Sequence, residues 1–276
     1  MARIDAHQHF WQFDAARDAW ISDDMAVLRR DFLPPDLQAL LQHYGFDGCV
    51  AVQASQSETE TDFLLELATQ YDFIKGVVGW VDLRAENLGE RLAYYRRFAK
   101  LKGFRHILQS EADRALMLGP EFRRGIAALS QHGFTYDLLI LPDQLAYATE
   151  LAAAFPNQAF VLDHLAKPLI KTGEVEPWRR NIQVLAAHQN VVCKVSGLLT
   201  EADWHNWQPT DFRPYLDVVF DAFGPNRVLF GSDWPVCEVA GGYSQTVSLL
   251  KDYLGSFSRT EQARFWGDNA ASFYAL

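Results

Sequence analysis

Short apolar runs alternate with longer amphipathic stretches along most of this chain. Eight runs rich in branched and aromatic residues are expected to form β-strands, and the stretches between them have the periodicity of helices. The expected strands are Arg3–His9, Gly48–Gln53, Val77–Asp82, Gly103–Leu108, Phe134–Ile140, Ala159–His164, Val191–Gly197 and Val228–Asp233. The expected helices include Glu58–Tyr71, Leu88–Phe98, Pro120–His132, Pro142–Phe155, Pro177–His188 and Phe212–Phe223. Ser57 followed by Glu60 is a capping-box pattern, and Pro142 and Pro177 suit a first helical turn.

Several of the expected strands, such as VVGWV and VLFGS, are apolar along their whole length. Such strands are typical of parallel sheets that helices cover on both faces. Eight strand and helix units predict an α/β protein with a closed (β/α)8 TIM barrel, and the 276 residues are close to the ~250 typical of this fold. No linker-like segment divides the chain, so one domain is expected over residues 1–276. A doubly wound open sheet is the alternative, but no GxGxxG motif follows the first strand.

Composition narrows the classes of partner. The chain has 25 Lys+Arg against 35 Asp+Glu and no basic stripe, which argues against a nucleic-acid partner. Its three cysteines are widely spaced without a CxxC pair, so neither disulfides nor a thiolate zinc site are expected. The first residues lack the order of a signal peptide, and no apolar run has the length of a membrane span. We therefore expect a cytoplasmic protein without a membrane partner, and the oligomeric state stays open.

Polar residues that end the apolar runs are the candidates for chemistry, because barrel enzymes carry their active sites at the carboxyl ends of the strands. His7 and His9 end the first run, and side chains two residues apart on a strand share a face. His164 ends the sixth run and Asp233 the eighth. Singly, a histidine is often half-buried for packing and an aspartate can cap a turn. Imidazoles and a carboxylate from three segments on one rim indicate a catalytic site.

Four segments carry a resemblance to a known family. They read IDAHQHFW, GFRHILQ, VLDHLAKP and VLFGSDWP, in that order along the chain. With these segments the chain resembles the amidohydrolase superfamily, and within it the amidohydrolase-2 branch that contains sugar lactonases of the L-fuconolactonase and L-rhamnono-lactonase types. The resemblance covers essentially the whole chain and implies a barrel hydrolase that opens lactones.

The same resemblance implies roles for the four rim residues. His7 and His9 correspond to a metal-ligand pair, His164 to the histidine of the sixth strand, and Asp233 to the general base and a possible ligand. One divalent metal such as zinc, held by His7, His9 and Asp233, would leave an open position for water. The branch also includes members that work without metal, so both versions stay open.

The chain departs from the pattern of superfamily members that hold two metals. Arg105 and His106 stand where those members have a bridging lysine or glutamate, and Tyr136 stands where they have a histidine. A site with two metals is therefore not expected.

The expected function is hydrolysis of a sugar-derived aldonolactone, similar to L-fuconolactone, to the aldonic acid. This reaction needs a nucleophilic water, a stabiliser for the oxyanion and a proton for the leaving oxygen. Asp233 would take a proton from water and return it to the leaving alkoxide. A metal or the donors His7, His9 and Arg105 would hold the carbonyl oxygen, and His164 would orient the water or the carboxylate.

Other polar and aromatic residues at the strand ends suit a small polyol ring, because such groups hydrogen-bond to a sugar or stack on it. The candidates for substrate binding are Gln53, Trp80, His106, Gln109, Tyr136 and Lys194. Packing is the alternative role for the two aromatic rings, and pairing with a carboxylate is the alternative for the lysine. The long segment Phe10–Pro35 is expected to fold over the mouth of the barrel and to contribute Trp11 or Trp20 to the pocket wall.

Three alternatives to a sugar lactonase remain. A metal-dependent decarboxylase of the same superfamily would be expected to have a histidine in place of Tyr136. A hydrolase of a dicarboxylate lactone would recognise its substrate through Arg105 and Lys194. A carbohydrate-binding protein is the non-enzyme alternative, but the eight tryptophans are scattered along the chain. The sequence leaves open which lactone is the substrate and the size of its ring.

Overall fold

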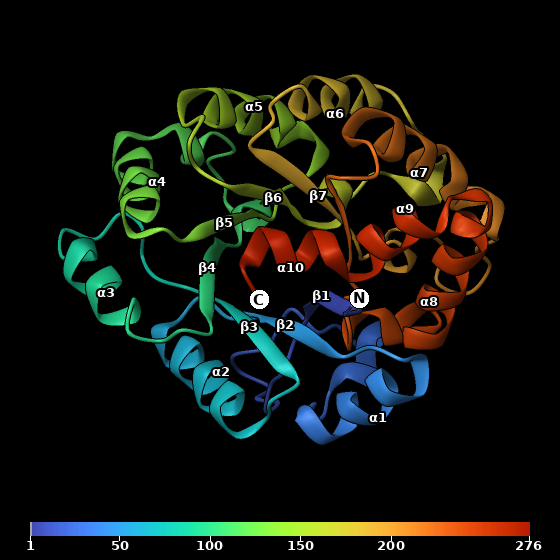
Figure 1. Cartoon of the computed structure of the whole chain (residues 1–276), viewed down its shortest axis with the longest axis horizontal. Coiled ribbons are helices and arrows are strands. Elements are labelled where there is room, and N and C mark those ends of the chain that lie inside the picture. Colours follow the sequence, from blue (N-terminus) through green and yellow to red (C-terminus); the bar gives the residue numbers. More distant parts are fainter. Residues whose placement is uncertain (1) are drawn as a thin grey trace.

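A computed structural model describes residues 2–276 and confirms the predicted α/β barrel. Eight parallel strands pair in sequence order, and helices surround them on the outside (Figure 1). The strands are β1 (Ile4–Gln8), β2 (Gly48–Val52), β3 (Ile74–Gly79), β4 (Leu101–His106), β5 (Thr135–Leu138), β6 (Phe160–Leu162), β7 (Val191–Val195) and β8 (Val228–Phe230). The helices that follow them are α1 (Pro34–Tyr44), α2 (Glu58–Gln70), α3 (Leu88–Tyr95), α4 (Pro120–His132), α5 (Leu145–Ala154), α6 (Trp178–Ala186), α7 (Pro209–Phe223) and α8 (Gly242–Tyr253). Two short helices, α9 (Arg259–Ala263) and α10 (Asn269–Tyr274), end the chain.

The expected helices are present, with differences at their ends that have local causes. Pro142 begins a separate 3-10 turn before α5, so the predicted helix from this proline is divided in two. Ser57 caps α2 by accepting the N–H of Glu60 at 3.1 Å. The reciprocal half of the expected capping box is missing, because the Glu60 carboxylate accepts the backbone N–H of Ala54 instead.

The barrel closes between β1 and β8 through a short seam. The amide of Asp233 donates to the carbonyl of His7 at 2.8 Å, and the amide of His9 donates to the carbonyl of Trp234 at 2.7 Å. The Asp5 carboxylate adds a side-chain contact, since its Oδ1 accepts the amide of Ser232 at 2.9 Å. Three expected site residues therefore belong to the backbone that closes the barrel.

An irregularity in β1 decides which of its side chains face the barrel interior. The register with β2 shifts between Asp5 and Gln8, so β1 contains one extra residue there. Ile4 packs inside the barrel before this bulge, and His7 and His9 point inward after it. A bulge re-aims the residues that follow it, and here those residues are the two histidines.

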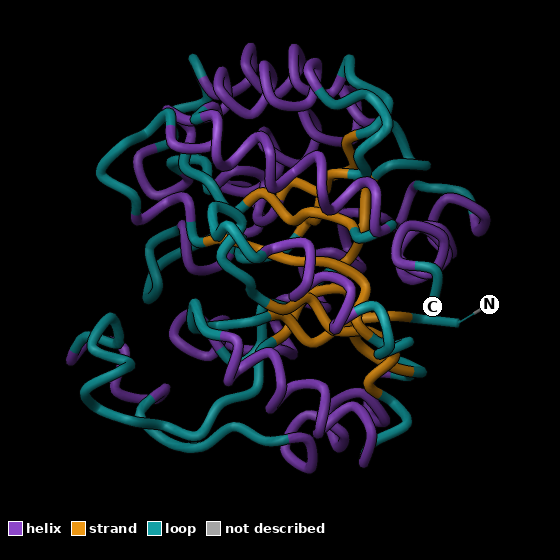
Figure 2. The backbone as a smooth tube through the Cα atoms, turned by 90° about the vertical axis from the view of Figure 1, so that its left-hand side faces the viewer, coloured by secondary structure: helices purple, strands orange, loops and turns teal. Residues whose placement is uncertain are grey.

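The C-terminal helix α10 closes the opposite end of the barrel. Figure 1 shows α10 crossing the centre of the ring of strands, and Figure 2 shows the C-terminus on the side where β1 begins. Two residues of α10, Ala270 and Tyr274, are buried with an inner apolar cluster of the strands. Its other buried members are Ile4, Ala6, Val50, Val52, Val78, Val161 and Leu229. The amino-terminal end of the barrel is therefore packed, and the pocket lies at the other end.

Two further observations bear on the expected class of protein. The cysteines Cys49, Cys193 and Cys237 are buried and free of disulfides. Across residues 2–276, no helix combines the length and the apolar character that crossing a membrane requires.

Candidate active site

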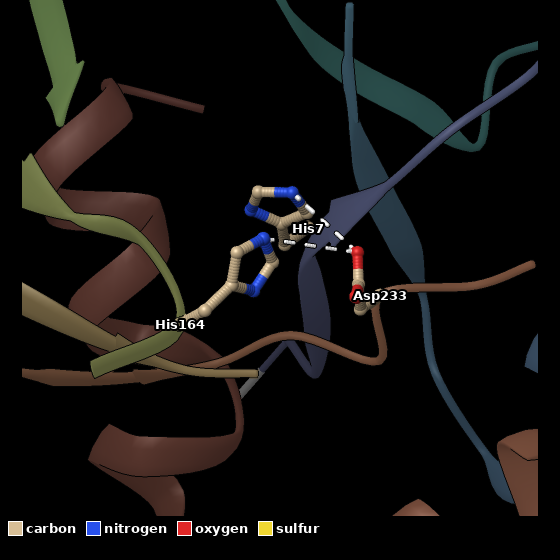
Figure 3. Close-up of side chains that lie close together, drawn as sticks. All are labelled: His7, His164 and Asp233. Atoms are coloured by element: carbon tan, nitrogen blue, oxygen red, sulfur yellow. Dashed lines mark ion pairs between the residues drawn. The ribbon is translucent and has the colours of Figure 1, made fainter. Parts of the chain in front are cut away.

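Three histidines surround one carboxylate at the carboxyl end of the barrel. Oδ1 of Asp233 lies 3.4 Å from Nε2 of His9, 3.8 Å from Nε2 of His164 and 3.9 Å from Nε2 of His7. Figure 3 shows His7 and His164 facing Asp233 from different segments of the barrel. All four residues are buried. The structure thus brings together the four residues that the sequence pattern selected.

Two of these residues lie just beyond their strands, in an unusual backbone conformation. The segment His164–Lys167 has four consecutive φ values between 50° and 57°, and Asp233 has a φ of 58°. None of these residues is glycine, so each left-handed conformation costs roughly 1–2 kcal/mol. Backbone strain of this kind is concentrated at functional sites, where the surrounding structure holds it in place.

Two glycines make room for the histidines. Gly197 has a φ of 61°, and a Cβ atom there would lie 2.6 Å from Nδ1 of His164. A Cβ atom on Gly231 would lie 2.5 Å from Cβ of His7. Both distances are shorter than side chains tolerate, so the ring of His164 and the Cβ atom of His7 pack directly against bare backbone.

Hydrogen bonds hold the Nδ1 atom of two of the histidine rings. Nδ1 of His9 lies 2.7 Å from the carbonyl oxygen of Val52, and Nδ1 of His164 lies 2.9 Å from Oγ of Ser196. A carbonyl oxygen can only accept, so Nδ1 of His9 donates to Val52. This contact orients the ring so that Nε2 of His9 faces Asp233 and the pocket.

Burial and neighbouring groups set the charges at the site. Burial lowers the pKa of His7 and of His164 well below the ordinary value, so both rings are neutral near pH 7. Burial alone would raise the pKa of Asp233, but the imidazoles of His164 and His9 outweigh it and hold that pKa below its usual range. The centre is therefore an ionised carboxylate among imidazoles, the state in which a carboxylate can accept a proton.

A cluster of buried charges lies beneath this centre. Nη1 of Arg105 is 3.0 Å from Oδ2 of Asp163 and 3.2 Å from Nε2 of His7. Nζ of Lys194 is 3.1 Å from Oδ1 of Asp163 and 2.5 Å from Oδ2 of Asp137. Burial raises the pKa of Asp163, but Lys194, His7 and Arg105 together bring it well below the usual range. Two cations and two carboxylates compensate one another, which is what buried charges require.

A pocket of about 230 Å³ opens over the carboxylate and its histidines. Its polar lining consists of His9, Arg105, Gln109, Ser110, His164, Lys167 and Asp233. Its apolar lining consists of Trp11, Trp20, Ala54, Ile107, Leu139 and Val236. Both tryptophans of the segment Phe10–Pro35 line the pocket, as expected for a segment that folds over the mouth. The pocket has the mixed apolar and polar lining that is typical of sites for small molecules.

The residues expected to bind substrate lie in three different environments. Gln109 lines the pocket together with Arg105. Trp80 donates its Nε1–H to Nδ1 of His106 at 3.3 Å, and Nε2 of that histidine lies 2.6 Å from the Glu111 carboxylate.

The other three are fully buried. Gln53 donates to the carbonyl of Arg105, and Lys194 belongs to the charged cluster below the pocket. Tyr136 packs between Phe122 and Phe160 in the layer between the sheet and the helices.

Lys167 is a pocket residue that the sequence reasoning missed. Its Nζ pairs with Oε1 of Glu201 at 2.9 Å, and it adds a second cation to the pocket lining beside Arg105. The available signal was its position in the segment HLAKP, three residues after His164. The left-handed turn brings Lys167 to the pocket. This turn contains no glycine, so the sequence does not indicate it.

The donor set fits a divalent metal such as zinc. Ligand atoms of His7, His164 and Asp233 all lie within 4.8 Å of one another, and His9 adjoins them with its free Nε2. Nitrogen and carboxylate ligands, with the second ring nitrogen held by a hydrogen bond, are typical of zinc sites. This cluster has His164 in the place of His9, which the sequence analysis put in the ligand set. Arg105 also contacts Nε2 of His7, so the site has a fixed cation of its own.

Comparisons with known proteins agree with this geometry. The family model described as Amidohydrolase matches residues 4–276. An L-fucono-1,5-lactonase of Burkholderia multivorans is 44% identical, over 99% of this chain and 96% of that protein. An L-fucono-1,5-lactonase of Burkholderia ambifaria is 38% identical over the same shares. A crystal structure of an amidohydrolase from Burkholderia multivorans with bound zinc is 44% identical, with a TM-score of 0.95 and full coverage of both chains. The chain therefore belongs to the amidohydrolase family.

Proposed function

We propose that this protein is a hydrolase that opens a sugar-derived 1,5-lactone of the L-fuconolactone type to the free aldonic acid. The observation that carries the proposal is the ionised carboxylate of Asp233, which three imidazoles surround at the base of a small polar pocket. The two relatives named L-fucono-1,5-lactonase, each similar over almost the whole chain, support the choice of substrate class.

Asp233 is the proposed general base. Its pKa lies below the usual range, so the carboxylate is ionised near neutral pH. In this state it can accept a proton from water. Nε2 of His9 and the ring of His164 orient the water between them. As Asp233 takes the proton, the water oxygen bonds to the carbonyl carbon and forms a tetrahedral intermediate. The protonated carboxyl then returns the proton to the ring oxygen as the bond between that oxygen and the carbonyl carbon breaks.

Arg105 is the proposed electrophile for the lactone carbonyl. It lines the pocket, and its guanidinium is anchored from below by Asp163. A cation fixed before the reaction stabilises the oxyanion without reorganising, and such stabilisation is usually the largest contribution to catalysis. Lys167 lies at the same pocket and would receive the carboxylate of the product. The cost of burying Arg105 is offset by its partners, so its charge is available to the substrate.

A metal ion is compatible with this scheme. His7, His164 and Asp233 would hold it, and when bound it would supply Lewis-acid polarisation of the carbonyl or of water. Two of the chain's own groups have partners outside this ligand set: His9 is held by Val52, and Arg105 is held by Asp163.

The substrate assignment is tested with a panel of aldonolactones in a pH-indicator assay. We expect turnover of 1,5-lactones of 6-carbon sugar acids, and a loss of roughly 10³-fold in kcat/KM for Asp233→Asn, within the range typical of a lost general base. Asp217→Asn is the matched control, because Asp217 lies on the outer helix α7. Absence of turnover for every lactone in the panel would rule out the proposed substrate class.

Metal binding is tested separately from activity. Equilibrium dialysis of chelator-treated protein against zinc, followed by metal analysis, should give one zinc ion per chain. His164→Ala should weaken this binding by roughly tenfold or more, since even the loss of a supporting contact has that effect. His205→Ala, on an exposed loop, should leave it unchanged. Equal zinc affinity in His164→Ala would contradict the proposed ligand set.

A further inference from the structure

A row of four aromatic rings connects the mouth of the pocket to the residue that follows Asp233. The first ring, Trp20, lines the pocket and packs edge to face on Trp11, with 6.1 Å between the ring centroids. Trp11 packs in the same way on Phe32 at 5.4 Å, and Phe32 packs on Trp234 at 5.3 Å. The last three rings of the row are buried. Edge-to-face contact is an arrangement that aromatic pairs prefer, so the row is a packed unit.

The backbone of the segment Phe10–Pro35 fixes the position of Phe32 in this row. Trp11 and Phe32 exchange two backbone hydrogen bonds, of 3.0 and 2.9 Å. The Nε1–H of Trp11 donates to the carbonyl of Arg30 at 3.0 Å. The guanidinium carbon of Arg30 lies 3.8 Å from the centre of the Phe32 ring. The ring of Phe32 is therefore held by its own backbone and by Arg30, and it forms a firm support for the next ring.

Trp234, the last ring of the row, is held through both its side chain and its backbone. Its ring contacts Phe32 at 5.3 Å and Phe10 at 6.2 Å, each time edge to face. Its amide donates to Oγ of Ser232 at 3.0 Å, and its carbonyl accepts the amide of His9 at 2.7 Å. The rings of Phe10 and Phe32 thus hold the ring of a residue whose backbone belongs to the seam of the barrel.

Asp233 depends on the position of Trp234 because of its backbone conformation. Its φ of 58° is left-handed, and a residue other than glycine keeps such a conformation only where the surrounding structure holds it. The Asp233 amide donates to the carbonyl of His7, and its own carbonyl accepts the amide of Cys237 at 3.0 Å. A return to an ordinary φ would rotate the chain after Asp233 relative to the chain before it. This rotation would carry the ring of Trp234 away from Phe32, so the packing of the two rings opposes it.

We propose that Phe32 is a positioning residue that acts through the ring of Trp234 to hold the carboxylate of Asp233 beside His9. Oδ1 of Asp233 lies 3.4 Å from Nε2 of His9. The pocket lining includes Asp233 and His9 but neither Phe32 nor Trp234, so Phe32 acts on the reaction only through the residues that Trp234 holds. The kinetic consequence of this inference rests on the proposed lactonase function, whereas the position of the carboxylate does not.

The first test compares crystal structures of the native chain and of Phe32→Leu, which keeps an apolar side chain but removes the ring. We expect the distance between Oδ1 of Asp233 and Nε2 of His9 to change by about 1 Å, a misplacement large enough to affect catalysis. Phe212→Leu is the matched control, because the buried ring of Phe212 packs edge to face on Trp207 at 5.3 Å, and neither residue lines the pocket. An unchanged distance in Phe32→Leu, or an equal change in both variants, would overturn the inference.

Kinetics on the proposed lactone substrate provide a second measurement. Phe32→Leu should lower kcat roughly 10²-fold, the loss that such a misplacement can cause, with KM within about twofold of the native value. Phe212→Leu should keep the native kcat and KM. If no lactone is turned over but the carboxylate moves, the substrate proposal fails and this inference stands. Turnover of the lactone by Phe32→Leu at the native kcat overturns it. Should Phe32→Leu not fold, Phe32→Met is measured in its place, with the same changes expected and the same results overturning the inference.

Discussion

At the scale of single residues, two glycines leave the space that His7 and His164 occupy. Gly197 combines a left-handed φ of 61° with a close approach to His164. An added Cβ on Gly231 would meet Cβ and the backbone nitrogen of His7, so this histidine would have to shift as a whole. Substitutions at either glycine would therefore change the distances between the histidines and Asp233 without removing any of these groups.

Gly197→Ala should therefore displace His164 and lower kcat by roughly 10²-fold, the loss that a misplacement of about 1 Å can cause. The measurement is steady-state hydrolysis with the thermal midpoint recorded in parallel. Gly224→Ala is the control, because Gly224 has a similar φ of 68° and an added Cβ would meet no atom within 4 Å. If both variants lost the same activity, backbone strain rather than the clash with His164 would be the cause.

The buried carboxyl of Glu60 should make the stability of the folded protein depend on pH, independently of catalysis. Burial raises the pKa of Glu60 to about 7 from an ordinary value of 4.5. The folded state therefore binds the proton more tightly than the unfolded state, and its extra stability is complete below about pH 4.5 and is lost as the pH rises to about 7. Glu60→Gln keeps an acceptor for the Ala54 amide and should remove this loss. Thermal midpoints of both proteins from pH 4.5 to 8 should diverge with rising pH, and parallel curves would contradict the prediction.

At the scale of elements, the repeating pattern was enough to predict eight strands and their order. Apolar runs identify buried parallel strands, and the spacing of His7 and His9 places both rings on one face. The residue at which each strand ends was harder to predict from the sequence. β6 ends at Leu162, so His164 lies in a left-handed turn rather than on a strand, and no glycine in that turn signals it. Tyr136 could not be assigned to a face of β5 from sequence, because that strand is buried on both sides.

The segment Phe10–Pro35 contains two tryptophans with different roles. Trp11 is buried, and its Nε1–H donates to the carbonyl of Arg30 at 3.0 Å. Trp20 lines the pocket and packs edge to face on Trp11, although it remains 47% exposed. Trp11 thus anchors the segment, and Trp20 is free to contact the substrate.

Trp20→Ala should raise KM about tenfold, or ~1.4 kcal/mol of lost contact, with kcat little changed. The reason is that Trp20 lies on the pocket wall without touching the reactive groups. Val27→Ala is the control from the same segment, because Val27 is 50% exposed and is not part of the pocket lining. A tenfold fall in kcat at unchanged KM would instead place Trp20 in the catalytic step.

At the scale of the whole molecule, the two ends of the barrel differ, and buried charged side chains lie between them. α10 fills one end, the pocket opens at the other, and charged side chains of β4, β5 and β7 lie between them. The sequence predicted that Arg105 and Lys194 face inward at the active-site rim. It did not indicate that the two side chains lie at different depths along the barrel axis. Arg105 reaches the pocket, whereas Lys194 is enclosed by carboxylates. Depth along the barrel axis depends on strand register and tilt, which a single sequence does not display.

The seam between β1 and β8 also means that the site is assembled from the two ends of the sequence. His7 and His9 leave the ribosome before Asp233, which follows them in the sequence by more than 200 residues. Contacts so distant in sequence form late, since the intervening chain must already be ordered. A nascent chain that lacks β8 holds its histidines without the carboxylate they surround. The proposed site is therefore complete only once the ring of strands has closed.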